Sequence, residues 1–295
     1  MNTRQVGKHK LVEPLRVAVL LSAQTRTWEL CHENIKRFYE KGKKLHFRAR
    51  ASEFKVDYFC HTWDINSWRN PTEQHGTDKS FVTEQVSSDL KDRLKEVYNP
   101  KEIEIESFDD WKTGLDKRVL NIQPNTNQAW LPMFYSFQKS NQMKRNYEQE
   151  NNFQYDIVFK QRYDVLYDRE YPIGITNPDS TFGNRALWTF SNHVRKDFNE
   201  FFSNDFNDVT FYSDSPTMDI VSNIYDWLLK PGGNWVQNTY GPGSLIYKFL
   251  INHSILPSWD NSYNQLPIRK ESLDAGLKWP DDRKQIKQDA INFYK

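Results

Sequence analysis

A short, unbroken apolar run near the N-terminus constrains the fold of this chain more than any other feature. The run Arg16–Leu21 (RVAVLL) has no polar side chain after its first residue. Such a strand is typical of a parallel sheet covered by helices on both faces. Two further short runs, Val56–Cys60 and Tyr155–Phe159, follow segments of helical periodicity. The sequence therefore predicts an α/β protein with a Rossmann-like, mostly parallel sheet and flanking helices.

The segments between and beyond these strands predict the remaining elements. Thr27 is suited to cap a helix that continues to about Tyr39. The inward side of this helix is predicted to consist of Leu30, Ile35 and Phe38. The other expected elements are a helix at 80–98, an edge strand at 103–105, an irregular segment at 107–128, a long helix from Trp130 to about Glu150, strands at 185–190 and 208–212, and helices at 216–229 (capped by Ser215), 244–252 and 284–293.

Charge and cysteine content argue against several classes of protein. Lysine and arginine total 40 against 39 acidic residues, whereas a dedicated nucleic-acid binder usually carries a basic excess. Cys31 and Cys60 have neither metal-type nor disulfide-framework spacing. The apolar run Val17–Leu21 is too short to span a bilayer, and residues 1–15 lack the apolar core of a signal peptide. We therefore expect a cytoplasmic protein without a transmembrane segment, in the host cytoplasm if a virus encodes it.

Polar side chains follow three of the predicted strands at the point where each strand ends. These segments are Ser22–Arg26, His61–Asp64 and Arg162–Asp164. In open α/β sheets, ligands bind outside the carboxyl ends of the strands, where loops present side chains on a rigid scaffold. The three segments therefore predict one binding site.

The first two strand ends carry groups suited to a nucleotide. Gln24, Thr25 and Arg26 precede a helix N-terminus, which favours phosphate, and an arginine can hold a diphosphate in bidentate fashion. Because no glycine-rich loop is present, a capping turn with a surface arginine is the alternative. Trp63 offers a stacking face and Asp64 an acceptor for a ribose or a base. The alternative there is a buried tryptophan beside a loop-capping aspartate.

The third strand end carries most of the expected chemistry. Asp164 is placed where a cation bridging a diphosphate would lie, and Mg²⁺ or Mn²⁺ in such sites is held by one or two carboxylates. Arg162 is suited to neutralise the leaving diphosphate, and Asp168 to be a second, indirect ligand. The alternative is an arginine–aspartate pair that closes a turn. His61 has no partner at metal-ligand spacing, which favours a hydrogen-bonding loop histidine over a ligand.

Three motifs, taken in order, resemble a known family of enzymes. They are SAQTRTW at 22–28, VDYFCHTWD at 56–64 and YEQENNFQYDIVFKQRYDVLY at 147–167. They are similar to the GT-A-type glycosyltransferases of bacteriophages, large viruses and bacterial polysaccharide clusters. Those proteins carry SG-x-x-R, D-x-F-x-H-x-W and YD-x-V-x-x-x-R-x-D in this order. The resemblance covers about residues 16–168, with weaker similarity at 206–219.

The resemblance implies a GT-A-like fold and transfer of a sugar from a UDP- or GDP-sugar to a glycan or other hydroxyl acceptor. It gives Asp164 the place of the last acid in an Asp-x-Asp metal motif. Arg26 then lies in the nucleotide-facing turn and Asp64 near the nucleoside. Arg162 replaces the first acid of the motif. Besides a Mn²⁺ or Mg²⁺ enzyme, a metal-independent transferase therefore stays open, in which Arg162 and Lys160 hold the diphosphate.

No long Pro/Gly/Ser linker divides the chain, which favours one catalytic domain with a C-terminal extension. We expect a polar tail at 1–15, a single catalytic domain at 16–270 with a nucleotide-sugar half at 16–168 and an irregular acceptor half at 169–270, and a C-terminal extension at 271–295. An inverting enzyme needs one carboxylate to take the acceptor proton. Asp214 and Asp219 are the candidates, with Asp208 behind them. The alternative is that they are acids favoured by a helix N-terminus.

Two other functions stay open at this point. The basic segment Lys41–Arg50 and an aromatic content of 15% suggest a sugar transferase that modifies DNA bases, although the formal net charge of +1 argues against it. Ala23 stands in place of the glycine of the family's turn, and the first acid of the metal motif is missing. Both departures suggest a catalytically inactive binding module with the same fold.

Overall fold

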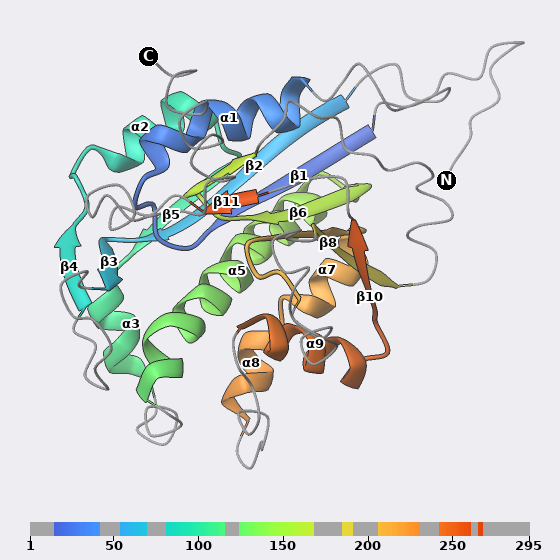
Figure 1. Ribbon diagram of the computed structural model, residues 1–295. Helices are drawn as coiled ribbons and strands as arrows, with labels where there is room; N and C mark the ends of the chain where they lie inside the picture. The colour runs from blue at the N-terminus through green and yellow to red at the C-terminus, as the bar shows by residue number, and fades with distance from the viewer. Residues whose placement is uncertain are drawn as a thin grey trace, which may run out of the picture.

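The short apolar segments form the strands of a seven-stranded sheet, and helices cover both of its faces (Figure 1). The structure is a computed structural model, and it describes residues 15–41, 54–69, 81–115, 124–167, 185–190, 206–230, 242–260 and 265–267. Apart from Leu15, the predicted tail at 1–15 lies outside these ranges, as do the predicted extension at 271–295 and the helix at 284–293 within it.

The bounds of the elements are as follows. The strands of the main sheet are β1 (Leu15–Ser22), β2 (Phe54–Trp63), β5 (Glu102–Glu106), β6 (Ile157–Gln161), β8 (Ala186–Phe190), β9 (Thr210–Ser213) and β10 (Leu256–Asp260). Two small antiparallel pairs are formed by β3 (Ile65–Arg69) with β4 (Phe81–Gln85) and by β7 (Val165–Tyr167) with β11 (Gln265–Pro267). The helices are α1 (Trp28–Lys41), α2 (Leu90–Tyr98), α3 (Phe108–Gly114), α5 (Pro124–Glu150), α7 (Ser215–Val221), α8 (Ile224–Leu229) and α9 (Pro242–Asn252).

Parallel pairing dominates the main sheet, whose strand order is β10-β8-β9-β6-β1-β2-β5. β1 pairs in parallel with β2 and β6, β2 with β5, and β8 with β10. Among the described strands of this sheet, β9 runs antiparallel to both of its neighbours, β6 and β8. The predicted α/β fold with a mostly parallel sheet is confirmed. As expected, the strand from Tyr155 to Phe159 is central and the strand at 103–105 lies at an edge.

Alternate residues of β1 build two separate hydrophobic cores. Val17, Val19 and Leu21 face α1 and α2, and all three are fully buried. Ala18 and Leu20 face the opposite layer, in which α5, α7, α8 and α9 contribute the buried residues. A strand buried on both faces cannot alternate apolar with polar side chains, which explains the unbroken apolar run. Burying each large apolar side chain contributes roughly 1.5–3 kcal/mol, so both helix layers stabilise β1.

Several predicted helices differ from the observed elements. The segment predicted as one helix at 80–98 is strand β4 followed by the shorter helix α2, because its first residues, FVTEQ, favour a strand. The segment at 107–128, predicted as irregular, contains α3 and the start of α5. Ser107 caps α3 by accepting a hydrogen bond from the Asp110 N–H at 3.2 Å. The predicted helix at 216–229 is divided into α7 and α8.

Two predicted side-chain roles are also corrected. Asp214, and not Ser215, caps α7, with its Oδ1 accepting from the Thr217 N–H at 2.8 Å. A carboxylate at this position also meets the positive end of the helix dipole. Leu30 is 45% exposed, while Ile35 and Phe38 are buried as expected. The rest of the inward face of α1 is formed by other side chains, among them Trp28 and Cys31.

Within the described residues, no helix combines the length and the apolar character that crossing a membrane requires. The long helix α5 carries buried polar residues such as Ser140, Asn141 and Lys144 among its apolar ones. Its apolar side chains pack against the sheet and the neighbouring helices.

Candidate functional site

The ends of β1 and β6 meet where the direction of the connections changes. From β1 the chain passes through α1 to β2 and through α2 to β5, on one side of β1. It then crosses through α5 to β6, on the other side of β1. Because the two sets of connections leave in opposite directions, the carboxyl ends of β1 and β6 flank a topological switch point. This is the place where open α/β sheets bind their ligands.

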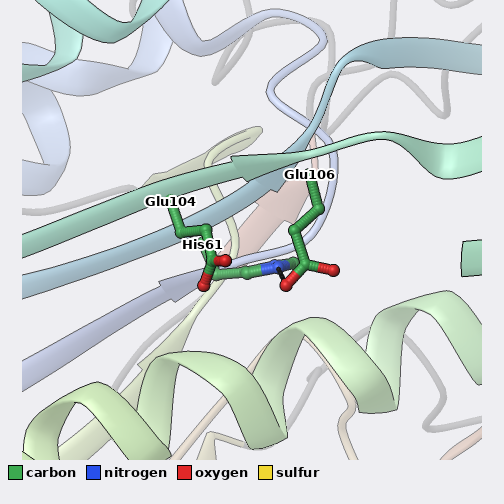
Figure 2. Close-up of side chains that lie close together, drawn as sticks. All are labelled: His61, Glu104 and Glu106. Carbon is green, nitrogen blue, oxygen red and sulfur yellow. Dashed lines mark ion pairs between the residues drawn. The ribbon is translucent and has the colours of Figure 1, made fainter. Parts of the chain in front are cut away.

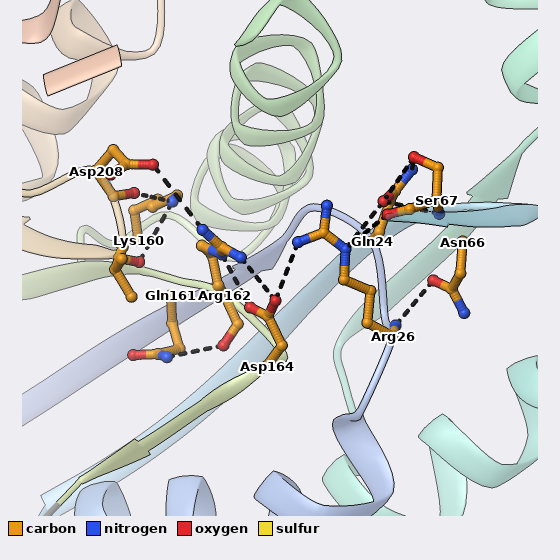
Figure 3. A network of polar contacts seen from close by, with 10 residues as sticks. Gln24, Arg26, Asn66, Ser67, Lys160, Gln161, Arg162, Asp164 and Asp208 are labelled. Atoms are coloured by element: carbon orange, nitrogen blue, oxygen red, sulfur yellow. Dashed lines mark hydrogen bonds and ion pairs between the residues drawn. The ribbon is translucent and has the colours of Figure 1, made fainter. Parts of the chain in front are cut away.

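Asp164 lies at the centre of a charged cluster at this point (Figure 3). Its carboxylate is 1% exposed and accepts hydrogen bonds from Arg162 Nε at 2.9 Å and Arg162 Nη2 at 2.6 Å. Arg26 Nη1, from the turn after β1, donates to Asp164 Oδ2 at 3.2 Å. Two of the three predicted strand ends are therefore joined through one carboxylate. Such charge-assisted, bidentate contacts fix the position of both guanidinium groups.

The turn after β1 is held by residues of β3 that the sequence motifs did not indicate. Arg26 donates from its backbone N–H to Asn66 Oδ1 at 2.8 Å and from Nε to the Ser67 carbonyl at 3.1 Å. Gln24 Nε2 donates to Ser67 Oγ at 2.9 Å, and Gln24 Oε1 accepts from Arg26 Nε at 3.1 Å. Buried Thr25 contacts Asn66 Oδ1 at 3.3 Å through its hydroxyl. These contacts preorganise Arg26 toward Asp164.

The backbone of this turn is strained at two positions. Ala23 has φ 110° and Arg26 has φ 44°, a region that residues with a side chain rarely occupy. Conformations of this kind cost of order 1–3 kcal/mol and persist where surrounding contacts hold them, commonly at functional sites. The Ala23 N–H donates to Ser136 Oγ of α5 at 2.8 Å. The Ser22 hydroxyl oxygen is fully buried and has no hydrogen-bond partner within the described residues.

Lys160 and Asp208 extend the cluster toward β9 (Figure 3). Lys160 is almost completely buried, and its Nζ donates to the backbone carbonyls of Asp208 and, at 3.3 Å, of Val209. Burial lowers the pKa of the Lys160 ammonium to about 7, an effect that nearby Asp208 partly offsets. Arg162 Nη1 lies 4.0 Å from Asp208 Oδ2. Two guanidinium groups and the Lys160 amine therefore gather around two carboxylates.

The second strand end does not provide an exposed stacking face. Trp63 is 1% exposed, and its ring packs among Phe108, Trp111 and Tyr135, stacking on the last with ring centroids 5.5 Å apart. Asp64 Oδ1 accepts from the Phe108 N–H at 2.9 Å, at the start of α3. The alternative of a buried tryptophan beside a loop-capping aspartate describes this strand end. Trp63 is the last residue of β2, and aromatic side chains from α3 and α5 cover its ring.

The acids proposed for proton transfer have structural partners. Asp214 caps α7, and Asp219 binds α5 through Lys144 Nζ and Asn141 Nδ2, at 2.8 and 2.9 Å. Of the three acids considered, Asp208 is the one with a contact to the charged cluster. Asp168 lies outside the described residues, as does the basic segment at 41–50 apart from Lys41.

His61 is not a loop residue, and it does have potential co-ligands. It lies inside β2, fully buried, and the pairing of β2 with β5 places Glu104 and Glu106 beside it (Figure 2). Burial lowers the pKa of the His61 imidazole, although Glu106 favours its protonated form. Partial burial alone would raise the pKa of the Glu106 carboxyl. Hydrogen bonds from His61, Lys139 and Tyr135 outweigh this effect and lower the pKa to about 2. Sequence spacing gave no sign of this group because its members come from different strands.

The residues at Asp164 do not fit a directly bound divalent cation. Two guanidinium groups already neutralise the Asp164 carboxylate through both of its oxygens, so a directly bound cation would face two positive charges at hydrogen-bond distance from the same group. Among the described residues, the group that could hold a metal ion is His61 with Glu104 and Glu106. The positive charge at Asp164 suits an anionic ligand instead.

Models of known protein families give no match to this chain, and curated proteins give none either. What the site can do must therefore be argued from its own geometry and charge.

Proposed function

We propose that this chain is a GT-A-like glycosyltransferase that moves a sugar from a UDP- or GDP-sugar to a glycan or other hydroxyl acceptor. The observation that carries the proposal is the pair of arginines held by buried Asp164 at the switch point of the sheet. The order of the three sequence motifs supports the same activity. Two of these motifs contribute the arginines.

The arginines are suited to the diphosphate of the donor. Arg26 is partly exposed, with 23% of its side chain accessible, and it precedes the first turn of α1. A helix N-terminus and a guanidinium group together favour a phosphate. When the sugar leaves, negative charge grows on the diphosphate, and preorganised cations lower the energy of that transition state. Asp164 acts in this scheme as a positioning residue for Arg26 and Arg162, without a bound metal.

Asp208 is our candidate for the general base, the carboxylate that takes the proton from the hydroxyl group of the acceptor. It lies beside Arg162 and is partly exposed, with 25% of its side chain accessible. A general base must be able to reach the reacting hydroxyl and retain a free carboxylate oxygen. Asp214 and Asp219 are less suited, because α7 and α5 engage their carboxylates.

The proposal is tested by nucleotide binding to matched arginine variants. We expect UDP or GDP to bind the wild-type chain, and each of Arg26→Gln and Arg162→Gln to raise the Kd about tenfold or more. A hydrogen bond to a charged group is worth about 1.5–3 kcal/mol, which corresponds to this factor. Arg93→Gln, at an arginine of α2 paired with Glu29, should leave the Kd unchanged. Calorimetry provides the Kd, and release of UDP or GDP from nucleotide sugars measures turnover.

Two results would contradict the proposal. One is that neither nucleotide binds the wild-type chain, with or without Mn²⁺. The other is that Arg26→Gln and Arg162→Gln bind as tightly as Arg93→Gln. Binding without release of nucleotide from any nucleotide sugar would favour the inactive binding module.

A further inference from the structure

A second polar group lies on the α5 face of the sheet, at the edge formed by β2 and β5. In the register of these strands His61 pairs with Glu104 and Trp63 with Glu106. Residues two apart on a strand point to the same face, so both glutamates and the histidine project toward α5 (Figure 2). Ile103 and Ile105 project to the opposite face and pack against the other core.

Ser136 of α5 holds one ring nitrogen of His61 in place. Its Oγ lies 2.9 Å from His61 Nδ1 and 3.2 Å from the His61 carbonyl, and it accepts from the Ala23 N–H at 2.8 Å. The single hydroxyl proton can go to Nδ1 or to the carbonyl, so the tautomer of His61 follows from what Nε2 binds. When Nδ1 donates to Ser136 Oγ, Nε2 carries a lone pair that can bind a cation.

His61 Nε2 is buried and has no hydrogen-bond partner among the described residues. The residue is fully buried, and its Nε2 lies 3.5 Å from Glu106 Oε1. A lone pair on Nε2 would face this carboxylate, which is unfavourable unless a proton or a metal cation lies between them. Two ligands of one tetrahedral cation, each about 2.1 Å from it, are about 3.4 Å apart, which matches this separation. In metal-binding histidines the other ring nitrogen usually donates a hydrogen bond that orients the ring, and Ser136 Oγ is placed to accept one from Nδ1.

From these contacts we infer that His61, Glu104 and Glu106 form a binding site for a divalent transition-metal ion such as Zn²⁺. The three ligand atoms lie within 4.8 Å of one another, and the Glu104 side chain is 42% exposed and can rotate inward. One imidazole and two carboxylates favour Zn²⁺ over Mg²⁺, which prefers oxygen ligands and retains its water. A surface hollow of about 370 Å³, lined in part by Glu104 and Lys139, adjoins the group and offers an entry path.

Lys139 supplies a positive charge beside Glu104 and Glu106. Its Nζ lies 2.7 Å from Glu106 Oε1 and 3.4 Å from Glu104 Oε2. The ammonium group neutralises the glutamates from the solvent side, but His61 Nε2 has no hydrogen-bond partner among the described residues. A metal ion would satisfy all three ligands and release the lysine, whose side chain is 33% exposed and has room to move. Lysine and metal therefore compete for the same carboxylates.

This competition gives a test in which two substitutions act in opposite directions. The full chain, stripped with a chelator, is titrated with Zn²⁺ against a chromophoric competitor, in the absence of nucleotide. We expect Glu104→Gln to weaken Zn²⁺ binding at least about tenfold and Lys139→Met to tighten it by a similar factor. The matched control Glu96→Gln changes an exposed glutamate of α2 and should leave the affinity unchanged. With Co²⁺ in place of Zn²⁺, visible absorbance should report nitrogen coordination and be lost in His61→Asn.

Two outcomes would overturn the site. The first is that neither the wild-type chain nor Lys139→Met binds one Zn²⁺ per chain. The second is that binding occurs but responds to Glu104→Gln no more than to Glu96→Gln, which would place the ion at other residues. Thermal unfolding of each variant shows that the fold is retained. Since no nucleotide takes part, the result is independent of the proposed transferase activity.

Discussion

At the scale of single residues, Ala23 shows how the turn after β1 is strained. Its φ of 110° is a conformation that glycine adopts readily and alanine does not. The family that the sequence resembles has glycine at this position. We therefore expect Ala23→Gly to raise the free energy of unfolding by about 1 kcal/mol, because relief of strain outweighs the added freedom of the unfolded chain.

Chemical denaturation of Ala23→Gly measures this effect, and Ala18→Gly in β1 is the matched control. Ala18 is fully buried in a regular strand, so the same change there should lower the free energy of unfolding. If both substitutions destabilise the protein to a similar degree, the turn stores no strain at Ala23.

At the scale of elements, a buried ion cluster attaches α5 to α7. Lys144 Nζ, fully buried, lies 3.0 Å from Glu148 Oε2 and 2.8 Å from Asp219 Oδ1. It also donates to the Ser215 hydroxyl, which in turn donates to Glu148 Oε1 at 2.7 Å. Breaking a buried ion pair from one side leaves uncompensated charge and costs about 3–5 kcal/mol.

We therefore expect Lys144→Ala to lower the free energy of unfolding by about 3–5 kcal/mol. Lys95→Ala, in α2, removes a lysine that is 54% exposed and whose ion pair among the described residues is with exposed Asp92, so it should cost less than about 1 kcal/mol. Urea denaturation followed by circular dichroism compares the two. Equal effects would mean that the cluster contributes nothing beyond an exposed pair.

The elements were predicted from sequence to different degrees for physical reasons. The sequence predicts β1, and the apolar first part of β6 (Ile157–Phe159), because a strand buried on both faces carries consecutive apolar side chains. The sequence predicts β4 as part of a helix, because its last three residues are polar and exposed and show no alternation that would indicate a strand; among the described strands it pairs with β3. α3 was missed because its seven residues include no fully buried side chain and so show no apolar periodicity.

At the scale of the whole molecule, topology decided which predicted site residues meet. Because ligands bind at the carboxyl ends of parallel strands, the sequence predicts that Arg26, Arg162 and Asp164 lie in one site. Their side chains are in contact in the structure. The sequence does not predict the role of Asn66, because that role depends on the short antiparallel pair of β3 and β4. It does not predict the group at His61 either, because the register of β2 and β5 places Glu104 beside His61 and no local sequence pattern reveals this register.

This topology leads to a prediction about how the molecule responds to a ligand. A diphosphate bound by both arginines contacts two chain segments, 22–28 after β1 and 160–167 at the end of β6, that are joined through Asp164. With UDP or GDP at about 100 times its Kd, binding stabilises the native state by about 2.7 kcal/mol. We expect amide hydrogen exchange to slow in both segments together, by up to about 100-fold where local opening breaks the site. A peptide from α9 (242–252), which packs on β10 at the far end of the strand order, should change little. Protection confined to one of the two strand ends would show that Asp164 does not join them into one binding site.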